Sequence, residues 1–457
     1  MSDVARMDAI GPRAPGPAFS GEVVRPGQDV YDEVRKVHNG LVDKRPALIV
    51  RCRDAADVVE ALTIAREAGL EVAVRGGGHS IAGRGTTDGG VMIDLSLMKG
   101  ISIDPDRRTA RVGGGVTWRE FNDATAVHGL ATTGGVISTT GVGGLTLGGG
   151  LGWLMGTHGL SVDNLVGVEL VTAAGEVLAV NVEDHPDLFW ALRGGGGNFG
   201  VVTSFEFRLH PVGQVFGGLV AHPFEAAGNL LRFCRDFTAD VPDELALMPL
   251  LVHAPDGSGV PLAAVAMCHT GTSDAAEADL RPLLDFGAPV LQQVGPMSYP
   301  AVNTMLDDGF PHGALYYWKS SFMPGLTDAA IDVMVERFAA CPSPMSGIAI
   351  EHFHGAVTRI PATVTAVPHR DPSYNLLIAG VWADTAATDA NIAWTRSTYR
   401  ELEPFFVDRR YVNYFSGDDT QLRSAYGPNY ERLADVKRRY DPESVFRVSH
   451  NIEPARR

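Results

Sequence analysis

The sequence is poor in three features that would each point to a particular class of protein. Only four of the 457 residues are cysteines, and none forms a CxxC pair, so neither a zinc site nor a disulfide framework is expected. Lysine and arginine number 38 against 54 aspartates and glutamates, and the net charge of −16 argues against nucleic acid and anionic membranes as partners. No apolar run approaches the length of a membrane span.

The N-terminus also lacks the apolar core of a secretory signal. Residues 1–20 are rich in proline, glycine and alanine, which favours a flexible tail. A cytoplasmic location is therefore the default expectation.

Glycine, in contrast, is abundant, and it gathers in a few segments. Strand-like residues 71–74 lead into VRGGGHSIAGRGTTDGG, which begins at Val74 and places His79 directly after three glycines. Consecutive glycines allow positive φ and a close approach of backbone to ligand, and their exposed N–H groups can cradle phosphate oxygens. A P-loop or dinucleotide fingerprint would need a helix next, but the strand-like Val91-Met92-Ile93 follows instead.

Local signals predict alternating elements around this loop. Asp54 caps a helix over 54–70, and Thr117 with Glu120 forms a capping box for a second helix that ends at Gly129. Pro186 opens a third helix that Gly194 ends. Strands are expected at 91–95, 109–112 and 200–209, with a hairpin over 165–180. A second glycine-dense stretch, 134–159, is too rich in glycine for a regular helix.

The composition changes near Pro211, where glycine becomes rarer. Strands are predicted at 215–221, 263–269, 347–353 and 374–382 among amphipathic helices, and a last helix at 430–440. The expected fold class is α+β, with a mainly antiparallel sheet backed by helices in the second domain. The expected organisation is a tail at 1–20, one domain at 21–212, a second at 213–405 and a C-terminal segment at 406–457.

Six motifs in register resemble a known family. They are RGGGHS (75–80), GVGGLTLGGGLG (141–152), GLSVDN (159–164), RGGGGNFGVV (193–202), YVNY (411–414) and YDPESVF (440–446). The set resembles the FAD-linked oxidases of the berberine bridge enzyme type, within the vanillyl-alcohol oxidase superfamily, including the bacterial 6-hydroxy-D-nicotine oxidase group. The resemblance implies a two-subdomain PCMH-type FAD-binding domain at 21–212, a substrate domain at 213–405, and a C-terminal segment that returns to the FAD domain.

The resemblance also implies which residues hold FAD. His79 would carry the flavin through its 8α-methyl group, although a histidine that only caps the loop is the alternative. Many family members add a cysteinyl link, but Ile137 holds that position here, so a single covalent link is expected. The other cofactor contacts would come from Arg75, Gly76, Gly77, Gly78, Ser80, Thr140, Gly141, Val142, Gly143, Gly144, Gly150, Gly200, Val201, Val202, Asn413 and Asn451. For individual glycines, simple turn geometry is the alternative.

The base beside the flavin would be Tyr414, the second aromatic residue of the YVNY segment, with Tyr411 as the fallback. A free phenol has a pKa of about 10, so this role needs a lowered pKa or a concerted proton transfer. The alternative for Tyr414 is a buried tyrosine with a satisfied hydroxyl.

The resemblance implies polar active-site groups of the substrate domain at His352 and His354. Strand alternation places them on the face of Ile350, with Glu351 on the other. Two such histidines are also a possible metal pair, but no third ligand lies nearby in sequence, and no metal is expected. The segment 316–319 either lines the same site or is a plain core strand.

The resemblance therefore implies an FAD-dependent oxidase. It would move hydride from a C–OH or C–N carbon of a small molecule to flavin N5, and O2 would reoxidise the flavin to give H2O2. A monooxygenase or cyclase, and a flavin-binding protein without turnover, are the alternatives. Sugar, alkaloid, polyketide and simple alcohol substrates all remain open, as does the oligomeric state.

Overall fold

The computed structural model describes residues 16, 17, 19–419 and 421–456, so most of the predicted N-terminal tail (1–20) lies outside the described residues. The first half of the chain begins with a four-stranded sheet in the order β1-β2-β4-β3, in which β2, β4 and β3 are parallel. Asp54 accepts a hydrogen bond from Asp57 N and starts α3, as predicted. The elements are β1 (Glu22–Val24), α2 (Tyr31–Val34), β2 (Leu48–Arg51), α3 (Ala55–Glu67), β3 (Val72–Arg75) and β4 (Val91–Asp94).

A second, five-stranded sheet is antiparallel and runs in the order β5-β6-β10-β8-β9. The predicted hairpin is confirmed as β8 and β9, and the predicted capping box of Thr117 and Glu120 starts α4. The elements are β5 (Ile101–Asp104), β6 (Thr109–Gly113), α4 (Trp118–Ala126), β8 (Leu165–Val171), β9 (Val177–Asn181), α7 (Pro186–Leu192) and β10 (Val201–Arg208); β7 (Leu130–Ala131) pairs with β11 (His210–Pro211).

The second glycine-dense stretch differs from the expectation that it forms no helix. It contains two short helices, α5 (Val142–Leu147) and α6 (Met155–His158). Val142 and Thr146 are fully buried, so tertiary packing offsets the weak helix propensity of the glycines. Both helices end at glycines, Gly148 and Gly159, and the latter has a φ of 72°.

The second half of the chain forms a seven-stranded antiparallel sheet in the order β15-β12-β14-β13-β17-β18-β16. The four predicted strands are confirmed as β12 (Gln214–Pro223), β14 (Pro261–His269), β17 (Gly347–Phe353) and β18 (Ser373–Trp382). Strands β13 (Leu245–His253) and β15 (Leu291–Ser298) were not predicted from the sequence. The segment 316–319, for which a strand was one of two expectations, lies in β16 (Leu315–Met323).

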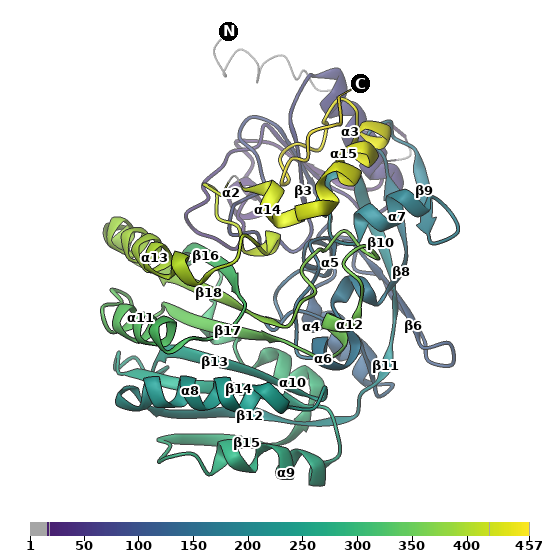
Figure 1. Cartoon of the computed structure of the whole chain (residues 1–457). Helices are drawn as coiled ribbons and strands as arrows, with labels where there is room; N and C mark the ends of the chain where they lie inside the picture. Colours follow the sequence, from purple (N-terminus) through teal and green to yellow (C-terminus); the bar gives the residue numbers. More distant parts are fainter. Residues whose placement is uncertain (1–15, 18, 420, 457) are drawn as a thin grey trace.

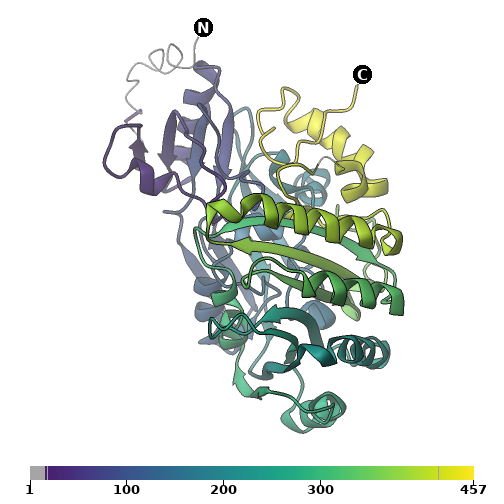
Figure 2. The same cartoon turned by 90° about the vertical axis from the view of Figure 1, so that its left-hand side faces the viewer.

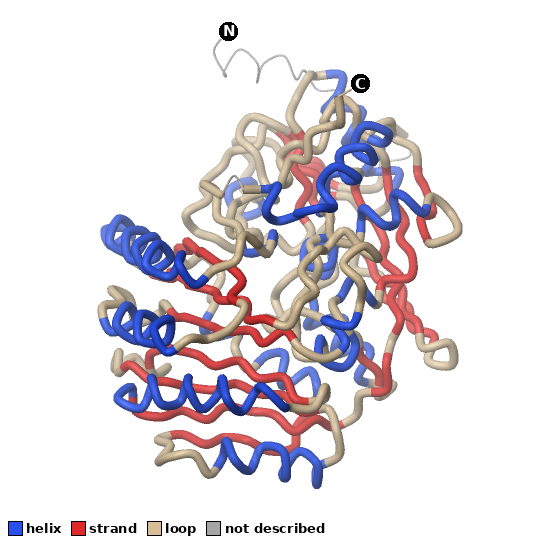
Figure 3. The backbone as a smooth tube through the Cα atoms, in the orientation of Figure 1, coloured by secondary structure: helices blue, strands red, loops and turns tan. Residues whose placement is uncertain are grey.

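Four helices cover one face of this sheet (Figures 1 and 2). They are α8 (Ala227–Phe237), α9 (Ser273–Leu284), α11 (Asp328–Ala339) and α13 (Thr388–Leu402). The other face turns toward the first half of the chain, where α10 (Tyr299–Thr304) and residues such as Trp153 and Leu154 pack against it. Figure 3 shows these strands as a layer separate from those of the first half. The predicted α+β class, with an antiparallel sheet backed by helices, is confirmed.

The C-terminal segment contains α14 (Leu422–Tyr426) and α15 (Tyr430–Tyr440), and α15 packs against α7. Asn198 holds the last residues, because its side chain donates to His450 O and accepts from Ile452 N. The short helix α12 (Ala356–Arg359) follows β17. Within the described residues, every helix is too short or too polar to cross a bilayer.

Candidate active site

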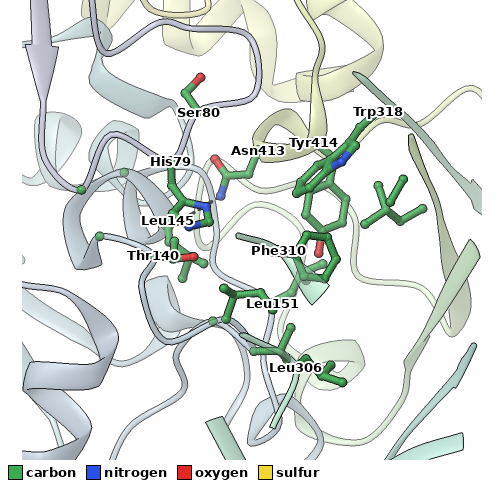
Figure 4. Close-up of a pocket in the computed structure, with 18 of the residues that line it drawn as sticks. His79, Ser80, Thr140, Leu145, Leu151, Leu306, Phe310, Trp318, Asn413 and Tyr414 are labelled. Carbon is green, nitrogen blue, oxygen red and sulfur yellow. Dashed lines mark hydrogen bonds between the residues drawn. The ribbon is translucent and has the colours of Figure 1, made fainter. Parts of the chain in front are cut away.

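A cavity of about 1090 Å³ lies between the glycine loops of the first half and the face of the seven-stranded sheet that is turned away from α8, α9, α11 and α13 (Figure 4). This volume is at the upper end for pockets that enclose small ligands. Its walls come from both halves of the chain and from the C-terminal segment. It is the place where most of the predicted site residues meet.

The wall from the first half is built of bare backbone. A Cβ added to Gly77 would lie 2.4 Å from Gly141 N, so the two glycine loops touch backbone to backbone and only glycine fits. Gly78 has a φ of 70°. The predicted residues that line the cavity here are Arg75, Gly76, Gly77, Gly78, Ser80, Thr140, Gly141, Gly143, Gly144, Gly200, Val201 and Val202.

His79 faces the cavity from the end of the first loop (Figure 4). Its Nε2 lies 3.0 Å from Thr139 Oγ1, and its ring stacks on His38 with 3.7 Å between ring centroids. His38 stacks in turn on Tyr316 of β16. Burial, reinforced by His38, holds the pKa of His79 well below its usual value. The imidazole is therefore neutral near pH 7 and keeps a nitrogen lone pair available.

Tyr414 lies across the cavity, at the end of a 3-10 turn formed by Val412–Tyr414. Its hydroxyl donates to Glu351 Oε1 at 2.8 Å, and Asn375 Nδ2 donates to Glu351 Oε2 at 2.6 Å. Burial raises the pKa of Glu351 to about 7. Burial and the charge of Glu351 raise the pKa of Tyr414 well above 10, so the phenol stays protonated near pH 7 and must give its own proton to a partner before it can hold another.

Tyr411 also lines the cavity, but its hydroxyl is already engaged. It accepts hydrogen bonds from Gly150 N, Leu151 N and Asn413 Nδ2. Burial raises its pKa to about 12. Tyr411 therefore braces the loop at 148–151, and the geometry favours Tyr414 over this fallback.

The prediction that His352 and His354 face the site is wrong. Alternation along β17 holds, but Ile348 and Ile350 pack into the core beneath the helices, and His352 follows them. His352 stacks on His354 and Tyr374 outside the cavity, while Glu351 points into it. Among the described residues, no group of three or more His, Cys, Asp or Glu side chains is placed to hold a metal ion.

Three predicted cofactor residues are also absent from the cavity wall, namely Val142, Gly150 and Asn451. Val142 is fully buried in the core with Trp118. The backbone N–H of Gly150 donates a hydrogen bond to the hydroxyl of Tyr411. Ser449 and His450 line the wall in place of Asn451, and Asn413 lies in it as predicted.

The segment 316–319 was expected either to line the site or to form a plain core strand, and its residues divide between these two roles. Trp318 lines the cavity, with its ring edge-on to that of Tyr414 at 5.7 Å between centroids. The hydroxyl of Tyr317 and the amine of Lys319 instead bond to Asp418 on the other side of the strand.

Arg84 is a cavity residue that the sequence analysis missed. Its Nη1 donates to Val448 O and Ser449 O, while its Nε has no partner. Within the described part of the chain, no carboxylate forms an ion pair with it. A largely buried cation with an unused N–H is well suited to an anionic ligand, and the FAD pyrophosphate would supply one. Together with the glycine cradle, this shows that the residues present fit FAD.

Comparisons with known proteins give the family. The FAD binding domain family matches residues 46–181, and the berberine and berberine-like family matches residues 410–453. The chain is 33% identical to (R)-6-hydroxynicotine oxidase from Paenarthrobacter nicotinovorans, over 96% of this chain and 97% of that protein. This chain belongs to the FAD-linked oxidoreductases of the berberine bridge enzyme type.

Two further relatives agree with this family. An FAD-linked oxidoreductase from Dictyostelium discoideum is 31% identical over 96% of this chain and 95% of its own. The crystal structure of 6-hydroxy-D-nicotine oxidase from Arthrobacter nicotinovorans matches with a TM-score of 0.89 and 30% identity, covering 97% of this chain and all of that one. The protein is thus an FAD-dependent oxidoreductase, and its cofactor is FAD.

Proposed function

We propose that this oxidoreductase is an oxidase that removes hydride from a carbon bearing a hydroxyl or amine group. FAD, when bound, supplies the hydride acceptor at N5 and passes the electrons to O2, which becomes H2O2. The observation that carries the proposal is the Tyr414–Glu351 hydrogen bond, which faces the same cavity as His79 and the glycine cradle. Support also comes from the printed name of the nicotine relative, which is an oxidase.

The attachment of the cofactor is part of this proposal. His79 would form one covalent link to the 8α-methyl group, since its neutral imidazole faces the cavity. Ile137 lines the same wall and offers no thiol for a second link. Arg84 and the glycine residues of the two loops would hold the anionic and ribityl parts.

Tyr414 and Glu351 would accept the proton that the hydroxyl group of the substrate loses. When hydride leaves the carbon, the hydroxyl proton of the substrate moves to Tyr414 Oη, and the proton of Tyr414 moves to the Glu351 carboxylate. A carbonyl product results, and the proton is stored on Glu351. Because the pKa of Glu351 is about 7, its carboxylate is available at neutral pH and is still basic enough to accept that proton. Asn375 holds the second carboxylate oxygen in place.

The test combines colour, attachment and product. The purified protein should be yellow, and its flavin should stay with the polypeptide after acid precipitation. His79→Ala should release the flavin on acid treatment, while His128→Ala, at an exposed histidine outside the cavity, should not. Oxidation should yield one H2O2 per substrate. Oxygen incorporated into the product would instead indicate a monooxygenase, and a flavin that no substrate bleaches anaerobically would indicate a binding protein. The cytoplasmic location stays a prediction.

A further inference from the structure

The sheet face that closes the cavity is almost entirely apolar. It contributes Leu219 from β12, Met248 and Leu250 from β13, Leu377 from β18, and Leu291 and Met297 from β15. The lining thus includes residues of β16, where Trp318 contacts Tyr414, and of β15 at the opposite edge of the sheet, while β14 contributes none. With strands about 4.8 Å apart, this wall is roughly 29 Å across.

The opposite side of the same space is apolar as well. Leu151 comes from the second glycine stretch, and Leu306 and Phe310 come from the segment after α10 (Figure 4). Met305 lies beside them, and Met345 lines the wall near the start of β17. Methionine side chains adapt to the shape of an apolar ligand, so this wall suits a bulky hydrocarbon body.

Free polar groups are scarce inside this part of the cavity. Ser346 lines it, but its hydroxyl already donates to Val381 O and accepts from Val381 N. Gln293 and Asp308 are exposed, and His253, at the end of β13, lines the cavity with its Nδ1 unpartnered while its ring packs on Phe338 of α11. Among the described residues of the substrate domain, Glu351 is thus the buried side chain whose charge faces the reacting group. A sugar ring carries several hydroxyls, and each would lose its water without gaining a partner.

We propose that the substrate is an apolar compound with a single oxidisable hydroxyl or amine, and that it is not a carbohydrate. This rests on the proposed oxidase function and narrows it. The polar end of the substrate lies against Tyr414 and Glu351, and the apolar body extends along the sheet face toward β15. Affinity then comes from buried hydrocarbon area, and orientation comes from one polar anchor.

The experiment uses the holoenzyme and ligands that cannot be oxidised. Tertiary alcohols, from 2-methyl-2-butanol to 2-methyl-2-octanol, carry no hydrogen on the carbinol carbon. Their dissociation constants are measured from the perturbation of the flavin spectrum. Each added methylene should lower the dissociation constant by about fourfold. Glucose, cellobiose and xylobiose should neither perturb nor anaerobically bleach the flavin.

A matched pair of variants locates the binding wall. Leu306→Gln, inside the cavity, should weaken the longest alcohol by about fivefold or more. Leu41→Gln makes the same change at a leucine that is 37% exposed and outside the cavity, and it should have no effect. Dissociation constants that do not depend on chain length, or equal effects in the two variants, would overturn the proposal. A sugar that bleaches the flavin would also overturn it while leaving the oxidase function intact.

Discussion

Replacing Glu351 with glutamine isolates the acid–base group that the structure places beside Tyr414. The variant keeps the volume of the side chain and removes its charge. Asn375 Oδ1 has no partner in the native protein, so a flip of that amide would let it accept a hydrogen bond from the NH2 group that Glu351→Gln introduces. Folding should therefore survive the change.

The kinetic effect follows from the loss of the proton acceptor. A positioned general base contributes about 100-fold to 10,000-fold, so kcat/KM should fall by that factor, equivalent to about 3–5 kcal/mol of activation free energy. In the native enzyme kcat/KM should rise with pH and level off above about pH 7, because the ionised carboxylate is the active form. In Glu351→Gln this pH dependence should disappear.

The same pKa shift affects stability. The folded-state pKa of about 7 lies above the ordinary value of 4.5, so between these pH values the folded protein holds a proton that the unfolded chain has released. The contribution of Glu351 to the free energy of unfolding should therefore fall by about 3 kcal/mol as pH rises through this window. Buried histidines with lowered pKa values titrate in the same range in both proteins, so urea unfolding at pH 4.5 and pH 8 should show the loss as a difference between the native protein and Glu351→Gln.

The control is His352→Gln, one residue further along the same strand and on the opposite face. It should leave kcat/KM and its pH profile unchanged, because the ring of His352 lies outside the cavity. The assay is stopped-flow reduction of the flavin with any substrate found by anaerobic screening. If Glu351→Gln keeps kcat/KM within about tenfold of the native enzyme, or if His352→Gln loses as much, the assignment of Glu351 is refuted.

Two further predictions concern the cofactor cradle and the C-terminal segment. Gly77→Ala should lose most of its flavin, measured as flavin absorbance per polypeptide, because the new Cβ would meet the backbone of Gly141; Gly100→Ala, with open space around it, should keep its flavin. Lys437→Met should lower the free energy of unfolding in urea by about 3–5 kcal/mol, since both side chains of the Lys437–Asp441 pair are fully buried and Asp441 would remain charged. Part of the stability should return if Asp441 is also replaced by asparagine, which removes the charge and keeps an oxygen that can accept from the backbone N–H of Val445 or Phe446; no change in the single variant would contradict the reasoning.

Local chemistry allowed much of the protein to be predicted from the sequence. Caps, glycines and turns act over a few residues, which is why α3, α4, α7 and the β8–β9 hairpin were predicted near their observed bounds. The motifs also placed His79 and the glycine cradle, because each lies within one short segment. Strands β13 and β15 were missed for a physical reason. Most of β13 is buried on both faces and shows no polar alternation, and β15 is an edge strand with mixed exposure.

Tertiary structure alone decided which chemistry meets the flavin site. Strand alternation puts Glu351 and His352 on opposite faces of the sheet. It does not determine which of these faces the helices cover and which faces the cavity. That choice was made by Ile348 and Ile350, which pack beneath α8, α11 and α13 and turn Glu351 toward the cavity. The hydrogen bond between Tyr414 and Glu351 joins residues that are 63 positions apart in the sequence. The hydrogen bond from Arg84 to the backbone of Ser449 joins residues that are 365 positions apart. Contacts of that range depend on how whole elements pack, and no local pattern in the sequence records them.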